Sequence, residues 1–241
     1  MKKTALLLGG LGFIGRNLID ELKSEYQLIV FGHGAAASTA DYIYYQGDFR
    51  NQAAVEVIFQ KHTIDLVIHA ISSTIPSNED SLLDIDTNLI STVQLLELLK
   101  KYAVPKIIFL SSGGTVYGLI GETALVSETH PTNPISAYGI NKLAIEKYLY
   151  LYHHLYQIDY LILRLSNPFG EHHTSQTHGL INVTLNKILN HEPVIVWGDG
   201  AIIRDYIYIQ DCVNIIHQLI TKNVSNEIIN IGSSEGYSIN N

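Results

Sequence analysis

Tyr138 and Lys142 stand four residues apart in a segment that favours a helix, and this spacing places both side chains on one helix face. A free phenol has a pKa of about 10 and is a poor base at neutral pH. A nearby ammonium group stabilises the phenolate and lowers that pKa, so a tyrosine beside a lysine becomes a usable general acid or base. A second pair, Tyr102 and Lys106, encloses Pro105, which would break a helix. We therefore predict that Tyr138 acts as the general acid or base and that Lys142 lowers its pKa.

Gly9, Gly12 and Gly15 form a G-x-x-G-x-x-G pattern between the first expected strand and the first expected helix. Glycine permits a tight turn and lets backbone N–H groups approach a pyrophosphate, while the helix N-terminus adds the positive end of its dipole. The pattern and its position predict a dinucleotide-binding turn, to which we add the first helical residues, Phe13 and Ile14.

The end of the second strand leaves the choice of dinucleotide open. An NAD site usually has an acidic residue there to bind the ribose hydroxyls, but this chain has His33 instead. His33 could face the 2′-phosphate of NADP, or it could be a surface loop histidine, so we predict NAD without excluding NADP. Asp48 lies in the segment Gln46-Gly47-Asp48-Phe49, at the end of a strand between those expected at Gln27–Phe31 and Leu66–His69. Its carboxylate could accept a hydrogen bond from the adenine amino group. The alternative is that Asp48 caps the helix that begins at Gln52.

These residues need elements that position them, and the chain supplies short apolar runs that alternate with longer amphipathic stretches. Strands are expected at Thr4–Leu8, Gln27–Phe31, Leu66–His69, Lys106–Leu110 and Tyr160–Leu165, and helices at Phe13–Lys23, Gln52–Lys61, Asp84–Lys101 and Ala137–Tyr156. This alternation predicts parallel strands joined by right-handed crossovers. Because several strands are apolar throughout, we expect the sheet to be covered on both faces.

The strand–helix rhythm loosens after Ser166. We expect a helix at about Ile181–Asn190 and a strand at Val194–Trp197, followed by the strand Glu227–Ile231. We therefore divide the chain into a dinucleotide-binding domain, residues 1–165, and a substrate lobe, residues 166–241, with strands returning to the main sheet.

Composition and charge exclude several classes of protein. The net charge of −8 argues against a nucleic-acid binder, which needs a basic face to neutralise phosphates. Cys212 is the single cysteine, so neither an intramolecular disulfide nor a cysteine-based metal site can form. The histidine pairs at 153–154 and 172–173 have no ligand partner at metal-site spacing, and we predict no metal. No apolar stretch approaches the roughly 18 residues of a membrane-spanning helix, so we expect a cytoplasmic protein without a membrane partner.

Longer motifs surround the single residues discussed so far. They are Val67-Ile68-His69-Ala70, Asn88, Ser111-Ser112-Gly113-Gly114-Thr115-Val116-Tyr117-Gly118, Arg164-Leu165-Ser166-Asn167-Pro168-Phe169-Gly170 and Arg204-Asp205-Tyr206-Ile207-Tyr208-Ile209-Gln210-Asp211. In these motifs the chain resembles the extended short-chain dehydrogenase/reductase family, and more narrowly its nucleotide-sugar epimerases of the UDP-galactose 4-epimerase type. The resemblance runs from Met1 to about Ser238. It implies an α/β fold with a Rossmann-type doubly wound parallel sheet.

The resemblance also implies a mechanism. Tyr138 takes the proton from a sugar hydroxyl while hydride leaves the same carbon for the nicotinamide, and the hydride then returns to the other face of the keto sugar. Lys142 would also hold the nicotinamide ribose. The cofactor site gains four further residues in this way, namely Phe49, Ala70, Asn88 and Ser111.

Two residues match substrate-binding positions of the family, and Trp197 is a further candidate for substrate contact. Asn167 and Arg204 match positions that contact the substrate diphosphate, which suits a guanidinium because its fixed fork of donors fits phosphate oxygens. The alternative for Arg204 is a salt bridge with the adjacent acidic residues. Trp197 could flank the nucleotide base, or it could be a core tryptophan.

The chain departs from the family pattern in two places. The family usually has a serine or threonine at the position of Gly113, where its hydroxyl bonds the reacting oxygen. Ser112 or Thr115 could supply that hydroxyl here, and Thr115 could also contact the substrate. The absence of an Asp-Glu pair at Gly114 and Thr115 speaks against the related sugar dehydratases. Family members also continue for several tens of residues after a strand like Glu227–Ile231, so we expect either a fragment or a small, incomplete C-terminal substrate lobe.

We therefore predict an NAD-dependent epimerase of a nucleotide-activated sugar, acting at C4 of a UDP-hexose or its N-acetyl form. A nucleotide-sugar reductase is the alternative enzyme, and it would consume NAD(P)H. A catalytically silent dinucleotide-binding protein is a further alternative, which the Tyr138–Lys142 pair opposes. The family often dimerises through a four-helix bundle, and the helices Asp84–Lys101 and Ala137–Tyr156 could form one in a homodimer.

Overall fold

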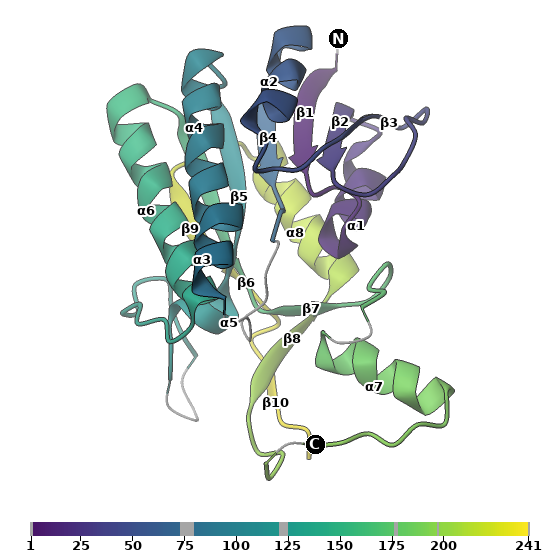
Figure 1. The fold of residues 1–241 in the computed structure, drawn as a ribbon. Coiled ribbons are helices and arrows are strands. Elements are labelled where there is room, and N and C mark those ends of the chain that lie inside the picture. The colour runs from purple at the N-terminus through teal and green to yellow at the C-terminus, as the bar shows by residue number, and fades with distance from the viewer. Residues whose placement is uncertain (1, 73–79, 121–124, 176–177, 197, 241) are drawn as a thin grey trace.

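The computed structural model describes residues 2–72, 80–120, 125–175, 178–196 and 198–240. At its centre lies a seven-stranded parallel sheet with the order β3-β2-β1-β4-β5-β6-β9 (Figure 1). The strands are β1 (Lys3–Leu8), β2 (Tyr26–Gly32), β3 (Tyr42–Gln46), β4 (Leu66–His69), β5 (Lys106–Ser112), β6 (Asp159–Leu165) and β9 (Glu227–Ile231). The strand order reverses direction between β1 and β4, which is where doubly wound sheets bind ligands, beyond the carboxyl ends of the strands. The predicted fold class is confirmed.

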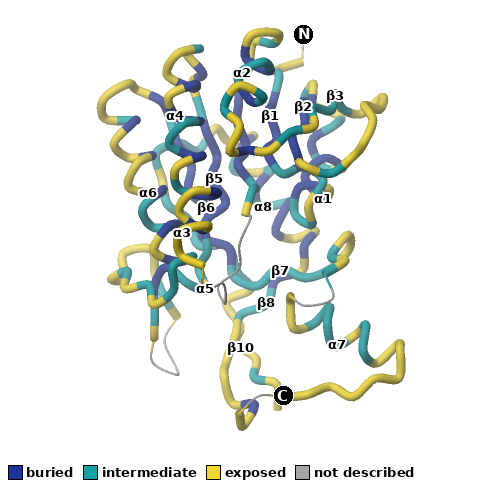
Figure 2. The backbone as a smooth tube through the Cα atoms, in the orientation of Figure 1, coloured by how far each residue is buried: buried dark blue, intermediate teal, exposed yellow. Residues whose placement is uncertain are grey.

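Helices cover both faces of this sheet. Alternate residues of β1 divide between two hydrophobic clusters, with Leu6 and Leu8 in one and Ala5 and Leu7 in the other. The first cluster is completed by α2 (Gln52–Lys61), α4 (Ser91–Lys101) and α6 (Ala137–Tyr156), and the second by α1 (Phe13–Leu22) and α8 (Ile209–Thr221). The strands are therefore the most deeply buried part of the molecule (Figure 2), as their continuous apolar sequences predicted.

A smaller lobe extends from the carboxyl edge of the main sheet (Figure 1). It contains a three-stranded sheet of β10 (Gly236–Tyr237), β8 (Arg204–Tyr208) and β7 (Asn167–Phe169), together with the helix α7 (Leu180–Leu189). Between β8 and β10 the chain returns to the main body as α8 and β9. None of the α7 residues is buried.

The predicted long helix at Asp84–Lys101 is not a single α-helix. It begins as α3 (Ser81–Asp84), continues as a π-helical segment, η1 (Ile85–Ile90), and becomes α4 at Ser91. Hydroxyl groups bond to backbone carbonyls along this stretch, as in the bond from Ser91 Oγ to the Asp86 oxygen (2.9 Å). Such bonds compete with the regular ladder, and π-helical turns are frequent at functional sites.

The predicted strand at Val194–Trp197 is also wrong over the residues that the structure describes. Residues 194–196 are irregular, and Trp197 lies outside the described residues. Val194, Ile195 and Val196 are 40%, 63% and 43% exposed. Their apolar sequence resembles that of a strand, but no neighbouring strand among the described residues takes up their backbone hydrogen bonds.

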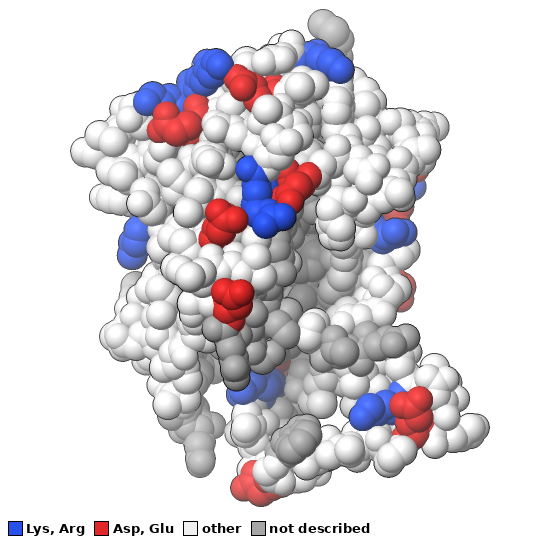
Figure 3. Space-filling model, viewed as in Figure 1, with Lys and Arg blue, Asp and Glu red and all other residues white. Residues whose placement is uncertain are grey.

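The surface carries its charges in small mixed groups. On the face shown in Figure 3, the Lys and Arg side chains mostly lie beside Asp and Glu side chains, so no broad basic patch forms there. Within the described ranges, no three His, Cys, Asp or Glu side chains gather closely enough to hold a metal ion. The same ranges contain no helix that has both the length and the apolar character needed to cross a membrane.

Candidate active site

The glycine turn connects β1 to α1 and packs against the backbone that follows β4. Gly9 follows β1 with a φ of +80°, a conformation that favours glycine, and its N–H donates to the Phe31 oxygen at 2.9 Å. A Cβ atom at Gly9 would lie 3.0 Å from the carbonyl carbon of Ala70, which follows β4. Gly9 and Ala70, both predicted cofactor residues, therefore meet at the point where the strand order reverses.

The start of α1 leaves an open backbone cradle that fits a pyrophosphate. Gly12 is the N-cap residue and supplies no side-chain cap to the first helical N–H groups, which can therefore receive an anion. A Cβ atom at Gly15 would lie 2.3 Å from the Gly9 oxygen, so the turn can pack on the helix only because residue 15 is glycine. The predicted glycine motif has the geometry of a dinucleotide-binding turn.

His33 and Asp48 lie on exposed loops after β2 and β3. Asp48 forms an ion pair with Arg50 at 2.5 Å, and the hydrogen bonds from Arg50 hold the pKa of the Asp48 carboxyl below its ordinary value. The alternative that Asp48 caps α2 is wrong, because the capping side chain is Asn51, which accepts from the Ala54 N–H at 3.3 Å. The Asp48 carboxylate is thus left at the surface near His33.

Three further predicted cofactor residues have side chains that are engaged within the protein. The Phe49 ring is buried and packs edge-on against His69 at a centroid distance of 5.2 Å. Asn88 is buried in η1, and its amide donates to Asp84 Oδ1 at 2.6 Å. The Ser111 hydroxyl donates to Glu146 Oε1 at 2.6 Å. Phe49, Asn88 and Ser111 therefore line the core beneath the cofactor cradle with their side chains.

His69, at the end of β4, is a buried and neutral histidine. The Thr92 hydroxyl donates to the Asn88 oxygen, so it accepts from Nε2–H of His69 at 2.8 Å, while Nδ1 accepts from the Ile71 N–H at 3.3 Å. Burial, reinforced by the charge of Lys142, lowers the pKa of His69 to about 3. The imidazole thus holds the backbone after Ala70, against which Gly9 packs.

The depressed pKa of His69 predicts an acid-sensitive fold. The unfolded chain takes up a proton on this histidine below about pH 6.5 and the folded chain does not, so stability falls as the pH falls. We expect His69 to account for a loss of about 2 kcal/mol between pH 7 and pH 5. Urea unfolding of the wild type and of His69→Gln at both pH values measures this difference. Exposed His154→Gln is the control, and an equal pH effect in wild type and His69→Gln would contradict the assignment.

The α6 helix brings the two predicted acid–base residues together. Ser136 caps α6 by accepting from the Gly139 N–H at 3.1 Å, which places Tyr138 in the first turn. Lys142 is 4% exposed, and its ammonium donates to the Leu110 oxygen of β5 at 2.8 Å. The same nitrogen lies 5.6 Å from the centroid of the Tyr138 ring. Within the described residues the Tyr138 hydroxyl makes no hydrogen bond, so it is available to a substrate.

Gly113 has no side chain, so it cannot supply the hydroxyl that members of the family usually have at this position. Gly113 begins the short helix α5 (Gly113–Val116), and a Cβ atom there would lie 3.1 Å from the Leu165 oxygen of β6. Thr115 lies on the same helix and packs against α6, where a Cβ atom at Gly139 would lie 3.2 Å from the Thr115 Cβ. The Thr115 hydroxyl is buried and has no hydrogen-bond partner. Ser112, half-buried at the end of β5, also has an unbonded hydroxyl within the described residues.

A buried ion pair that the sequence reasoning missed links β6 to α6, the helix that carries Tyr138. Arg164 of β6 and Glu146 of α6 form two hydrogen bonds of 2.6 and 3.1 Å, with side chains that are 2% and 1% exposed. Arg164 also donates to the Tyr117 hydroxyl at 2.9 Å, and Tyr117 donates to Asn230 of β9 at 2.6 Å. The network ties α6 to the sheet. Its signal in the sequence was an arginine among the apolar residues of β6 and a glutamate between Ile145 and Leu149 on the buried face of α6.

A pocket of about 250 Å³ lies within the smaller lobe, among β7, the start of α7 and β8. Its walls include Asn167 and Arg204, the two predicted diphosphate contacts, and none of its lining residues is Asp or Glu. The Arg204 guanidinium donates to the Ile203 oxygen at 3.0 Å and forms no ion pair within the described ranges. The salt-bridge alternative for Arg204 is therefore not present in the structure. Trp197 cannot be placed, because it lies outside the described residues.

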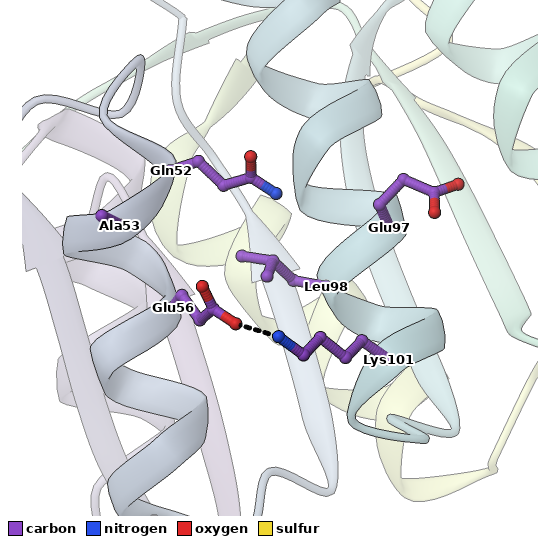
Figure 4. Close-up of a pocket in the computed structure, with 6 residues that line it drawn as sticks. All are labelled: Gln52, Ala53, Glu56, Glu97, Leu98 and Lys101. Carbon is purple, nitrogen blue, oxygen red and sulfur yellow. Dashed lines mark hydrogen bonds and ion pairs between the residues drawn. The ribbon is translucent and has the colours of Figure 1, made fainter.

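A second groove, of about 330 Å³, lies elsewhere, between α2 and α4 (Figure 4). It is lined by Gln52, Ala53, Glu56, Glu97, Leu98 and Lys101. The ion pair between Glu56 and Lys101 (2.6 Å) crosses it, and it contains none of the predicted site residues.

Residues 5–232 match the sequence profile of the family described as the NAD dependent epimerase/dehydratase family. The chain belongs to this family. A UDP-glucose 4-epimerase from Halalkalibacterium halodurans is 32% identical over 259 residues, covering 97% of this chain and 76% of that protein. A dTDP-glucose 4,6-dehydratase from Xanthomonas campestris is 31% identical over 253 residues, covering 96% of this chain and 71% of that protein. The family thus includes relatives with different reactions at similar identity.

Solved structures of the family have the same fold. The UDP-glucose 4-epimerase of Thermotoga maritima, solved with UDP-glucose, has a TM-score of 0.88 and 32% identity, over 98% of this chain and 79% of that one. The Thermus thermophilus UDP-glucose 4-epimerase, solved with NAD, has a TM-score of 0.89 and 29% identity, over 98% of this chain and 79% of that one.

Proposed function

We propose that this chain is an NAD-dependent epimerase that inverts C4 of a UDP-hexose. The observation that carries the proposal is the Tyr138 hydroxyl, which is unbonded within the described residues and shares a helix face with Lys142 at the carboxyl edge of the sheet. The names of the relatives support the choice of UDP-hexose, and the NAD complex among them supports the cofactor. Gly114 and Thr115 offer no acid, which disfavours dehydration.

NAD, when bound, supplies the acceptor and donor of the hydride at the sugar carbon. Tyr138 takes the proton from the C4 hydroxyl as the carbonyl forms, and returns it when the hydroxyl is restored with inverted configuration. The Lys142 nitrogen donates to the Leu110 oxygen and lies 5.6 Å from the centroid of the Tyr138 ring, and an ammonium group beside a phenol favours the phenolate. Thr115 would donate a hydrogen bond to the reacting oxygen, because its buried hydroxyl has no partner among the described residues.

The pocket of the smaller lobe has the donors that a diphosphate requires. The first hydrogen bond of α7 runs from the Val183 N–H to the Gly179 oxygen, so the three preceding N–H groups have no partner within the helix. Gly179 supplies no side-chain cap to them. With Arg204 and Asn167 on the same pocket, we assign the substrate diphosphate to this place.

The decisive experiment for this function measures interconversion of UDP-glucose and UDP-galactose by the purified protein with NAD. We expect both directions to proceed without net formation or consumption of NADH, because the hydride returns to the substrate. Stoichiometric consumption of NADH would indicate a reductase, and binding of NAD without turnover of any UDP-hexose would indicate a silent dinucleotide-binding protein. Either outcome would overturn the proposal.

Arg204→Ala is expected to raise KM for the UDP-hexose about tenfold or more and to leave kcat within about threefold. The guanidinium contributes a charge-assisted hydrogen bond to a phosphate, worth about 1.5–3 kcal/mol, in both the ground state and the transition state. Steady-state kinetics measures the change. Arg50→Ala, which removes an exposed arginine outside the pocket, is the matched control. An unchanged KM in Arg204→Ala would mean that this residue does not contact the phosphate.

We further propose that two copies pair through α6. Its exposed side includes Ile140, Tyr148, Leu151 and Leu155, whose spacing places them on one stripe. Leu149 and Tyr152 of the same helix are buried in the core and do not belong to this surface. Light scattering should give twice the chain mass for the wild type and the monomer mass for Leu151→Glu/Leu155→Glu, and a monomeric wild type would contradict the pairing.

We also propose that the chain divides into two domains at residue 165 and that the protein is cytoplasmic.

A further inference from the structure

His173 lies in the loop between β7 and α7, which packs against α1, the first helix of the dinucleotide cradle. This loop is held against α1, because the Asn17 amide donates to the Glu171 oxygen at 2.9 Å and Tyr208 donates to the Glu171 carboxylate at 2.7 Å. The backbone of His173 bonds back to the Gly170 oxygen at 3.3 Å. The position of the histidine is therefore set by both halves of the molecule.

The imidazole of His173 is packed on two sides. Its face stacks on Phe13, the first residue of α1, with a centroid distance of 4.3 Å and an interplanar angle of 11°. Its edge faces Gly179 so closely that a Cβ atom there would lie 2.2 Å from Cε1. Both contacts are made with residues at the N-terminal ends of helices, α1 and α7. The ring thus forms a shared wall between the dinucleotide cradle and the pocket.

Only one ring nitrogen of His173 can reach a ligand. Nδ1 is enclosed and has no hydrogen-bond partner, whereas Nε2 is not enclosed and is also unbonded within the described residues. Burial lowers the pKa of His173, and repulsion from His178 adds to the shift, so the imidazole is neutral at neutral pH. A neutral imidazole carries one N–H, which an acceptor in the pocket can take up.

We propose that His173 binds a phosphate oxygen of the nucleotide-sugar substrate through Nε2–H, from the wall that the substrate shares with the dinucleotide cradle. This inference rests on the proposed function. The pocket that His173 lines has Arg204 and Asn167 as polar walls and no acidic lining residue, so a phosphate oxygen is the acceptor that suits it. The neighbouring His172 instead approaches Asp20 of α1, with 3.6 Å between Nε2 and Oδ2, and is not part of the pocket.

The test compares the two adjacent histidines, with UDP itself as the probe. In calorimetric titrations we expect His173→Ala to raise the Kd of UDP about tenfold or more, and His172→Ala to change it less than twofold. His173→Gln retains an amide donor and should recover part of the affinity. KM for the UDP-hexose should follow the Kd of UDP, with kcat within about threefold of the wild type. The fraction of protein that carries NAD should stay unchanged in all three variants.

Gly179→Ala gives a second measurement with the histidine in place. The added methyl group would displace the ring, so UDP binding should weaken as in His173→Ala. Circular dichroism and thermal melting establish which variants are folded, and the His173→Ala and His172→Ala comparison decides the question if Gly179→Ala does not fold.

Three outcomes would overturn the inference: unchanged UDP affinity in His173→Ala, equal losses in the two histidine variants, or loss of NAD together with UDP. The last would mean that His173 supports Phe13 rather than binding substrate. Wild-type turnover of a UDP-hexose, measured in parallel, separates failure of this inference from failure of the proposed function.

Discussion

Tyr138→Phe is expected to lower kcat for UDP-hexose epimerisation by about 10²–10⁴-fold, because the phenylalanine ring keeps the packing and removes the group that exchanges the proton. Binding of NAD should stay within about twofold of the wild type, since the glycine cradle and Lys142 are untouched. Stopped assays of UDP-galactose formation, together with the NAD content of the purified variant, measure the two quantities.

The second Tyr-x-x-x-Lys pair of the chain provides the control. Tyr102 lies at the C-terminal end of α4, where its hydroxyl donates to Glu56 of α2 at 2.9 Å, so Tyr102→Phe should retain kcat. Full turnover in Tyr138→Phe would remove the assigned acid–base residue and the proposed mechanism with it. Thr115→Val tests the hydroxyl beside it, and we expect a smaller loss of kcat than in Tyr138→Phe, because one hydrogen bond to the reacting oxygen is removed.

Arg164→Met is expected to lower the free energy of unfolding by about 3–5 kcal/mol, the largest effect on stability that we predict. The substitution leaves the Glu146 carboxylate buried without its partner, although Ser111 still donates to it at 2.6 Å. Urea unfolding at pH 7 measures the loss. Lys23→Met, the control, breaks exposed pairs with Asp20 (3.1 Å) and Asp41 (3.2 Å) and should change the free energy of unfolding far less than Arg164→Met, because water screens exposed charges.

A double variant separates the cost of the unpaired charge from the contribution of the pair. Glu146→Leu/Arg164→Met replaces both partners by apolar side chains of similar size, and it should recover most of the stability lost in Arg164→Met. A single variant as stable as the wild type would mean that the pair contributes nothing to the fold. Because α6 carries both Glu146 and Tyr138, a lowered kcat in the folded double variant would show that the pair also positions the tyrosine.

Much of the fold followed from local pattern. The alternation of apolar strands and amphipathic helices predicted the parallel sheet, and α2, β4 and α6 begin and end at the residues expected. Such patterns are reliable because a strand covered on both faces must be apolar throughout. The strand expected at 194–197 was wrong over residues 194–196. An apolar run fits a buried strand, but it does not reveal whether a neighbouring strand is present to pair with it.

The sequence by itself determined the pairs and motifs whose members are close along the chain: the glycine turn from Gly9 to Gly15, and Tyr138 with Lys142 one helical turn away. Only the tertiary structure decided contacts between distant segments, because they depend on how strands and loops are placed in space. The Glu146–Arg164 pair, the stack of His173 on Phe13 and the burial of His69 are of this kind. Each joins residues at least 18 positions apart or buries a polar group, and no local periodicity encodes that.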